Sequence, residues 1–257
     1  MGPKTPTLLA GLLLLVLMPK TGLAQKDKPL FLDRRPGDDP SVIDITEVTD
    51  QYPKAAVDEY QKAVDQARKG NRAAARERLE AAIRIEPNFF NAHNSLAILF
   101  HTLSQYSDAE REYLEAARIN PRSLAPYVNL ASLHIEEALQ DQKAPRSLLN
   151  DALSNLNKAF EVQPGAPMAH YLSGIVYFMT GFYEESESHF KNALASGGSR
   201  LIIARLALAE IYIKLKEWDN VVVQLDEYLD EVPYAANRVR IRSVRNAAAE
   251  KLASPSQ

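Results

Sequence analysis

The five histidines, at positions 93, 101, 134, 170 and 189, are the residues of this chain best suited to acid–base or metal chemistry. They recur at repeat positions rather than at the spacing of metal ligands, and the chain has no cysteine to complete a thiolate site. It also contains no H-E-x-x-H, no P-loop and no G-x-S-x-G. The pair Gly197-Gly198 is not followed by G-K-[ST], so it is read as a turn. We therefore expect no enzyme activity, no catalytic residue, no metal site and no cofactor.

A unit of about 34 residues recurs along the chain, and Asn91 to Pro121 is its clearest copy. This copy is typical of two short amphipathic helices joined by a tight turn. Each predicted second helix has small or apolar residues at positions i, i+4 and i+7, which lie on one face of a helix. The first residue of this triplet is, in the five copies, Ala75, Ala109, Ala152, Ser186 and Val221. The spacings are 34, 43, 34 and 35 residues. Because neither helix can bury its apolar face alone, the units must pack on one another.

In this register the sequence resembles the tetratricopeptide repeat family, whose signature is W-x2-L-G-x2-Y, then A-x3-F, then P, with a period of 34. The clearest copy matches the signature at His93, Leu96, Ala97, Phe100, Ala109, Tyr113 and Pro121. The closing slot of the five units holds Pro87, Pro121, Pro164, Gly198 and Pro233. The resemblance implies an all-α fold, a right-handed α-solenoid of about five helix-turn-helix units with a C-terminal capping helix.

Three histidines occupy slots where this family places packing side chains. His93 and His170 take the slot of the signature tryptophan, and His134 takes the aromatic slot of its first helix. We expect structural roles for these three. His189 precedes Phe190 on a second helix and is expected to face solvent.

The repeats are expected to fill residues 54–235, as units 56–89, 90–123, 124–166, 167–200 and 202–235. A capping helix over 236–252 and a tail over 253–257 follow. The third unit has nine extra residues within 135–148, which favours a longer helix on each side of the turn. Whether this insertion contacts a partner stays open. Residues 25–53 are expected to form an extended leader, either flexible or lying against the first repeat.

The N-terminus has the pattern of a secretory signal peptide over residues 1–24. Lys4 precedes an apolar run of 11 residues from Leu8 to Met18, and Gly22-Leu23-Ala24 offers small residues for cleavage after Ala24. Retention as a membrane anchor is the alternative, but a span needs about 20 apolar residues. An exported chain without cysteine favours a bacterial periplasmic or secreted protein. Loss of Lys4 and Lys20 would change the net charge from −3 to −5, which argues against nucleic-acid binding.

The resemblance also implies a concave groove for a polypeptide, lined by positions 2, 5, 6, 9, 12 and 13 of each first helix. The groove residues it implies are Asn94, Ile98, His101, Val128, Asn129, Ser132, Tyr171, Ile175, Phe178 and Met179. Tyr171, Ile175 and Phe178 share one helix face and are predicted to form an exposed apolar patch. The alternative is that neighbouring helices or the leader cover them. A clamp for a C-terminal carboxylate is disfavoured, because Met168 and Leu172 stand where that clamp has basic residues.

The sequence thus predicts a non-catalytic protein–protein interaction scaffold that binds a peptide or helix in its groove and supports an envelope or secreted assembly. The alternative is a periplasmic carrier that binds a glycan or small molecule through Asn94, Asn129 and His101. The identity of the partner, the pathway and the oligomeric state are left open.

Overall fold

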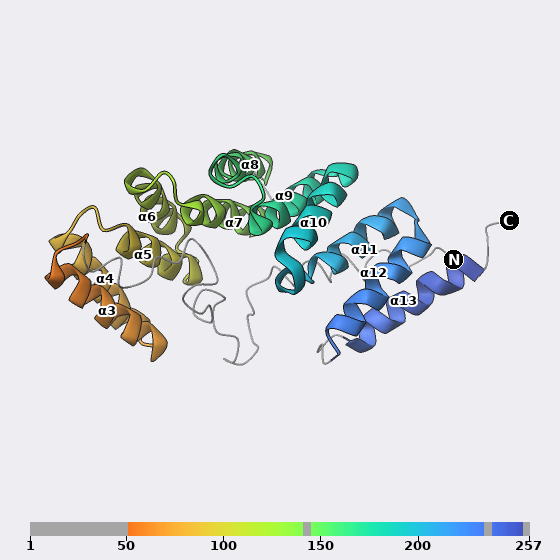
Figure 1. The fold of residues 1–257 in the computed structure, drawn as a ribbon, viewed down its shortest axis with the longest axis horizontal. Coiled ribbons are helices and arrows are strands. Elements are labelled where there is room, and N and C mark those ends of the chain that lie inside the picture. The colour runs from red at the N-terminus through yellow and green to blue at the C-terminus, as the bar shows by residue number, and fades with distance from the viewer. Residues whose placement is uncertain (1–50, 141–144, 234–237, 254–257) are drawn as a thin grey trace. The chain divides into compact units, whose positions relative to one another are not determined.

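The computed structural model describes residues 51–140, 145–233 and 238–253 (Figure 1). The predicted signal peptide, most of the leader and the tip of the insertion lie outside these residues. The described residues divide into two compact units, 51–162 and 163–253. Regular structure in them is entirely helical, which confirms the all-α prediction.

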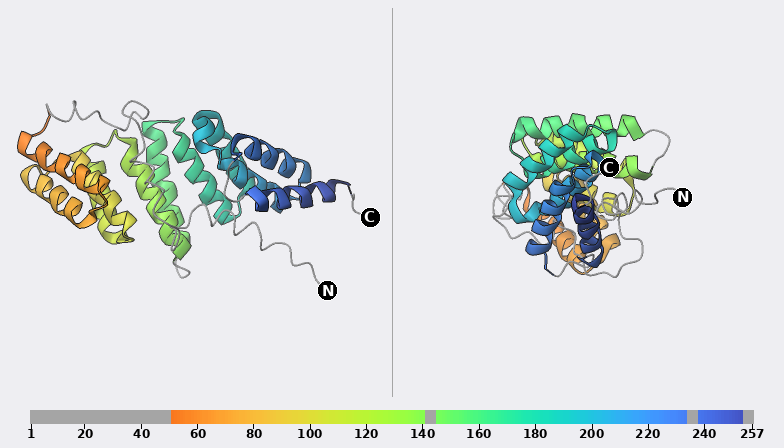
Figure 2. Two further views of the ribbon diagram at one scale, coloured as in Figure 1. Left: turned by 90° about the horizontal axis from the view of Figure 1, so that it is seen from below. Right: turned by 90° about the vertical axis from the view of Figure 1, so that its right-hand side faces the viewer.

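The first unit contains three helix-turn-helix pairs. They are α3 (Lys54–Arg68) with α4 (Arg72–Ile85), α5 (Phe90–Thr102) with α6 (Tyr106–Ile119), and α7 (Leu124–Gln140) with α8 (Pro145–Val162). Each helix packs against its partner, and α4 also packs on α5 and α6 on α7, so that consecutive pairs stack (Figure 2). This is the arrangement expected of repeats that share their apolar faces.

The second unit contains two more pairs and a closing helix. They are α9 (Pro167–Thr180) with α10 (Tyr183–Gly197), α11 (Ala204–Leu215) with α12 (Trp218–Glu231), and finally α13 (Arg238–Ala253), which packs on α12. A short 3-10 helix, η2 (Gly198–Leu201), follows α10. The predicted five pairs and closing helix are therefore present among the described residues.

Helices α7 and α8 are the long pair. They have 17 and 18 residues, against 13 in α5 and 14 in α6. Four extra residues in each helix account for eight of the nine residues by which this repeat exceeds the period. The insertion is therefore mainly added helical length.

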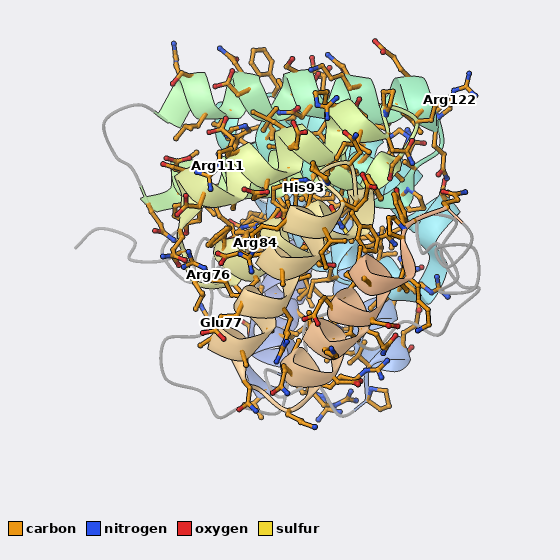
Figure 3. The ribbon with its side chains drawn as sticks, turned by 90° about the vertical axis from the view of Figure 1, so that its left-hand side faces the viewer. Arg76, Glu77, Arg84, His93, Arg111 and Arg122 are labelled. Atoms are coloured by element: carbon orange, nitrogen blue, oxygen red, sulfur yellow. The ribbon has the colours of Figure 1, made fainter. Side chains whose placement is uncertain are left out.

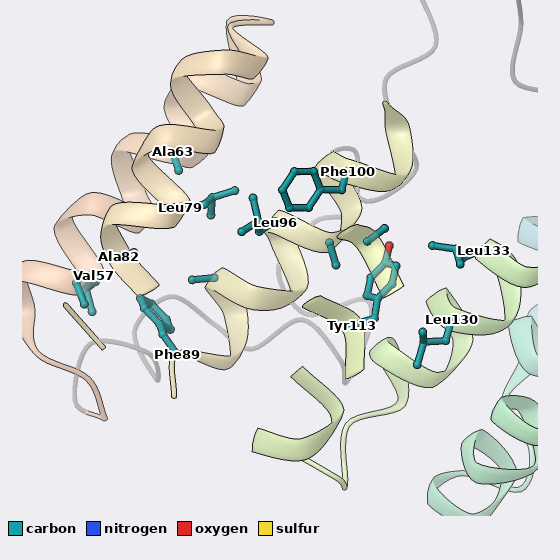
Figure 4. Packing of buried hydrophobic residues seen from close by; sticks show 14 residues of the cluster. Val57, Ala63, Leu79, Ala82, Phe89, Leu96, Phe100, Tyr113, Leu130 and Leu133 are labelled. Atoms are coloured by element: carbon teal, nitrogen blue, oxygen red, sulfur yellow. The ribbon is translucent and has the colours of Figure 1, made fainter. Parts of the chain in front are cut away.

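Small, aliphatic and aromatic side chains pack together in the core of the first unit (Figure 4). Ala82, Ala97 and Ala109 are fully buried, which allows helix backbones to approach closely. Phe89 and Tyr113, also buried, fill the remaining space. Burying an aromatic ring of this size stabilises the fold by about 1.5–3 kcal/mol.

The turns inside four of the pairs have the same construction, in which one residue adopts a positive φ. These residues are Gly70, Ser104, Gly181 and Lys216, with φ between 56° and 86°. After α9, the Phe182 N–H donates to the Tyr177 carbonyl at 2.9 Å and the Gly181 N–H to the Phe178 carbonyl at 3.2 Å. This is the Schellman ending of a helix, which satisfies carbonyls that the last turn leaves unpaired.

Candidate functional site

Consecutive first helices of the first unit are linked by polar contacts between residues 35 positions apart. Because a repeat has about 34 residues, such pairs occupy matching places on neighbouring helices. The contacts are Tyr60 Oη to Ser95 Oγ at 3.2 Å, Asn129 Nδ2 to Asn94 Oδ1 at 3.5 Å, and His101 Nε2 to Glu136 Oε2 at 3.1 Å.

Six of the ten predicted groove residues lie on α5 and α7, two helices in direct contact. We call them the α5–α7 face: Asn94, Ile98, His101, Val128, Asn129 and Ser132. All six are partly exposed. The face therefore offers two amides, a hydroxyl and two aliphatic side chains to a ligand within one unit, beside the imidazole of His101.

The two amides of this face are joined by a weak bond. The distance of 3.5 Å from Asn129 Nδ2 to Asn94 Oδ1 is at the outer limit for a hydrogen bond. Each side-chain amide has two donors and an acceptor, so most of this capacity is not used by the other. Exchanging this contact for a bond to a ligand would cost little.

His101 is held more firmly than its place on the face suggests. Its Nε2 contacts the Glu136 carboxylate, and its ring packs edge-to-face with Tyr106 and Tyr113, with 6.1 and 6.3 Å between ring centres. Gln140 Nε2 donates to Tyr106 Oη at 2.6 Å and fixes that ring in turn. His101 therefore links α5 to α7 through Glu136, and its Nε2 is already engaged in that contact.

The other four predicted residues lie on α9, in the second unit. Tyr171 and Ile175 are buried, with 6% and 0% of their surface exposed, so the prediction that they form an exposed patch is wrong. The Tyr171 ring packs edge-on against Phe190 of α10, with 5.6 Å between ring centres. Phe178 and Met179 are partly exposed, and Phe178 packs on Tyr183.

A second set of polar contacts joins the two helices of one repeat. Each begins at the slot of the signature tryptophan and ends 19 residues later on the second helix. We call them rungs: Glu59–Arg78, His93–Glu112, His170–His189 and Arg205–Gln224. Sequence reasoning missed them, although the constant spacing of 19 between complementary residues was visible.

The same slot also ties each repeat to the closing turn of the one before. His93 Nε2 bonds to the Pro87 carbonyl at 3.0 Å, and the Tyr127 hydroxyl donates to the Pro121 carbonyl at 3.3 Å, in both cases six residues back. These contacts explain why a polar residue can replace tryptophan there. They fit the structural role predicted for His93.

Two of the remaining histidine predictions have different outcomes. His134 is buried, as its packing slot indicated, and its Nδ1 has no hydrogen-bond partner in the described structure. His189 does not face solvent freely. It is half-buried, it contacts His170, and it stacks on Tyr177 with 5.3 Å between ring centres. The prediction for His189 was wrong because the rung to His170 was not recognised.

The rungs set the protonation of their histidines. Burial lowers the pKa of His93, but hydrogen bonds to Glu112 and to the Pro87 carbonyl outweigh it, and the net pKa is raised. Burial lowers the pKa of His170. Burial, and then repulsion from His170, lower the pKa of His189. At neutral pH the His170–His189 rung is therefore uncharged.

A surface depression of about 320 Å³ lies over α4, α5 and α6 (Figure 3). Its charges are largely matched internally. Arg76 pairs with Glu80, and Arg111 pairs with Asp108 and Glu112. Arg84 also lines the depression and has no ion pair among the described residues. One exposed guanidinium does not make an anion site, so this depression is secondary to the α5–α7 face.

Glu210 on α11 is an isolated carboxyl in the second unit. It is 2% exposed, and its Oε2 has no hydrogen-bond partner in the described part of the chain. Burial raises its pKa to about 7, and Lys214 opposes this only partly. Glu210 is therefore partly protonated at physiological pH.

Residues 51–140, 145–233 and 238–253 contain neither a metal-ligand cluster nor a membrane-spanning helix. No group of three or more His, Cys, Asp or Glu side chains there is placed to hold a metal ion. In the same residues, no helix combines the length and apolarity needed to cross a bilayer.

Comparison with known proteins supports the repeat interpretation. Residues 60–123 match the sequence profile of the tetratricopeptide repeat. No curated protein sequence matches the chain significantly.

Solved structures share the fold over most of the chain. The thermophilic TPR protein TTC0263 of Thermus thermophilus is 25% identical, with a TM-score of 0.59 over 76% of this chain and 99% of that one. PilW, a type IV pilus biogenesis factor, is 16% identical, with a TM-score of 0.61 over 79% and 94%. The APC/C hetero-tetramer Cut9–Hcn1 is 20% identical, with a TM-score of 0.62 over 82% of this chain but 39% of that one. The described residues therefore have the fold of tetratricopeptide repeat proteins, and residues 60–123 carry the sequence signature of that family.

Proposed function

We propose that this chain is a non-catalytic scaffold that binds a polypeptide segment on the α5–α7 face and supports an envelope or secreted assembly. Folds of the tetratricopeptide repeat type commonly mediate protein–protein interaction, and Cut9–Hcn1 is itself a complex of two proteins. Export with cleavage after Ala24, to the periplasm or the medium, is part of the proposal and is supported by the N-terminal sequence alone.

The Asn94–Asn129 pair is the observation on which this proposal depends. Two adjacent, partly exposed amides can each accept and donate one hydrogen bond to the main chain of an extended segment. Ile98 and Val128, also partly exposed, can contact its apolar side chains. This mixture suits a polypeptide, whose amide groups recur along an apolar or mixed sequence.

Photocrosslinking in the source cells would identify the partner and test the surface together. A photoreactive residue at Val128, on the α5–α7 face, should capture a discrete partner. The same residue at Glu77, an exposed position on α4, is the control and should not capture it. Equal capture from both positions would refute binding at this face.

Affinity for the captured partner should then depend on the two amides. Each lost hydrogen bond is worth about 0.5–1.5 kcal/mol, so losing two bonds from each amide in Asn94→Ala with Asn129→Ala should weaken binding by about thirtyfold or more. Asn150→Ala with Asn157→Ala removes two exposed amides from α8 of the same unit and is the matched control. An unchanged affinity in the first double variant would eliminate the amide pair as the binding element. Tight binding of a glycan or metabolite, with no polypeptide captured, would instead favour the carrier function.

A further inference from the structure

The His170–His189 rung differs from the other rungs because both partners are imidazoles, and a neutral imidazole can offer one nitrogen lone pair to a transition metal. His170 Nδ1 and His189 Nδ1 lie 3.0 Å apart, and the ring planes are inclined by 44°. The two rings come from α9 and α10, which pack directly on each other. Both side chains are partly exposed, so an ion can reach them from solvent.

We propose that His170 and His189 form a two-imidazole binding site for a divalent transition metal, with Cu²⁺ as the preferred ion. Imidazole nitrogens suit Cu²⁺, Zn²⁺ and Ni²⁺, and affinity for such donors is highest for Cu²⁺ in the first-row series. The remaining positions on the metal would be filled by water, since no third His, Cys, Asp or Glu joins the pair among the described residues.

The separation of the two nitrogens favours a right-angled arrangement on the metal. With bonds of about 2.0 Å, two nitrogens lie about 2.8 Å apart at 90° and about 3.3 Å apart at the tetrahedral angle. The observed 3.0 Å is nearer the first value, which is that of adjacent ligands on square-planar or tetragonal Cu²⁺. The metal would sit beside the line joining the nitrogens and replace the hydrogen bond between them. His189 would then carry its proton on Nε2 instead of Nδ1, and both rings would turn to direct their Nδ1 lone pairs at the metal.

The tautomer of His170 is already the one a metal requires. Its ring bonds to the Pro164 carbonyl, as His93 bonds through Nε2 to Pro87 in the second repeat. A ring that donates Nε2–H to a carbonyl has its lone pair on Nδ1, and this carbonyl contact is the usual support of a metal-bound histidine. Stacking on Tyr177 holds the ring of His189.

The site also starts uncharged, because burial lowers the pKa of both histidines. Protons therefore compete weakly with the metal at neutral pH. In the matching rung of the second repeat, Glu112 takes the place of the second imidazole and raises the pKa of His93. In both rungs the first histidine bonds to the carbonyl of the preceding closing proline, and only the second partner differs. The His93–Glu112 rung is therefore an internal control for metal binding.

The first experiment is a titration of the chain, prepared without a polyhistidine tag, with CuCl2 followed by calorimetry and electron paramagnetic resonance. One equivalent should bind, with a spectrum of two nitrogen ligands. Mg²⁺, which prefers oxygen ligands, should not bind there. A spectrum without paired nitrogens, or no stoichiometric binding, would overturn the proposal.

The decisive variant is His189→Gln. The glutamine NH2 can still donate to His170 Nδ1, so the rung and the fold are kept while one metal ligand is lost. Cu²⁺ affinity should fall at least about tenfold, with helicity and the unfolding midpoint unchanged. Equal affinity in this variant would overturn the proposal.

A gain of binding tests the same geometry in the first unit. Glu112→His would place a second imidazole opposite His93, whose Nε2 is already bonded to a carbonyl. This variant should bind a second equivalent of Cu²⁺ with the same paired-nitrogen spectrum. If it binds only one, the geometry of the rung does not select the metal and the proposal fails.

Discussion

The α9–α10 pair is packed so closely at Gly174 that one added methyl group should destabilise it measurably. A Cβ at Gly174 would lie 2.9 Å from three ring carbons of Phe190, a residue that is fully buried. Overpacking of this kind costs about 1–3 kcal/mol. Alanine is the better helix former by about 1 kcal/mol. We expect Gly174→Ala to destabilise the chain by a net of up to about 2 kcal/mol.

The same substitution should change sign once Phe190 is removed. Phe190→Ala alone should cost about 3–5 kcal/mol, because it leaves a cavity in the core. In that background the methyl group of Gly174→Ala meets no ring, and only its helix preference of about 1 kcal/mol remains. The two substitutions should therefore be coupled by about 1–3 kcal/mol.

Urea unfolding followed by tryptophan fluorescence would measure these changes in unfolding free energy. The signal reports on the second structural unit, because Trp218 is the only tryptophan of the sequence and lies on α12. Gly165→Ala is the matched control, since no atom lies within 4 Å of the added methyl group. If Gly174→Ala costs the same with and without Phe190, or if Gly165→Ala costs as much, close packing at this glycine is not the cause.

Three further predictions concern the turns and the titrating groups. Ser104→Gly and Lys216→Gly should each stabilise the chain by about 0.5–1 kcal/mol in urea unfolding, because both residues hold a positive φ that glycine adopts without strain. The pKa of Glu210 is raised by burial from 4.5 to about 7, so the folded chain retains a proton that the unfolded chain releases. Stability should therefore fall as pH rises through this range, and Glu210→Gln should flatten the profile of urea midpoint against pH. Glu112→Gln should lower the raised pKa of His93, measured by NMR titration; an unchanged pKa would show that the rung is not its cause. The stabilisation by this rung is present below pH 6.5 and is lost as pH rises through the folded pKa of His93.

Much of the fold could be predicted because it is periodic. Small residues such as Ala109, recurring every 34 to 43 positions, locate helix pairs without knowledge of what surrounds them. Even the longer helices α7 and α8 follow from the period. The positive φ at Ser104 and Lys216 could not be read from residue type, because neither is glycine. It follows instead from their place at the end of a first helix.

The candidate site was predicted less well, and Tyr171 shows why. Spacing shows which residues share a helix face, but it does not show what covers that face. Tyr171 and Ile175 share one, and both are buried. Asn94 and Asn129 were also selected by position, and they do remain partly exposed and close together. The distinction depends on side-chain packing between helices, such as Tyr171 on Phe190, which a single-repeat pattern does not contain.

The contacts between residues 35 positions apart also make neighbouring repeats distinguishable. Tyr60 meets Ser95, Asn94 meets Asn129 and His101 meets Glu136, and no two of these pairs are chemically alike. Arrays of similar repeats are prone to misassembly in which a unit stacks on the wrong neighbour or on another molecule. A stack that skipped α5 and α6 would place Tyr60 opposite Leu130, which offers it no polar partner. The polar contacts therefore favour the native order of the repeats over this alternative.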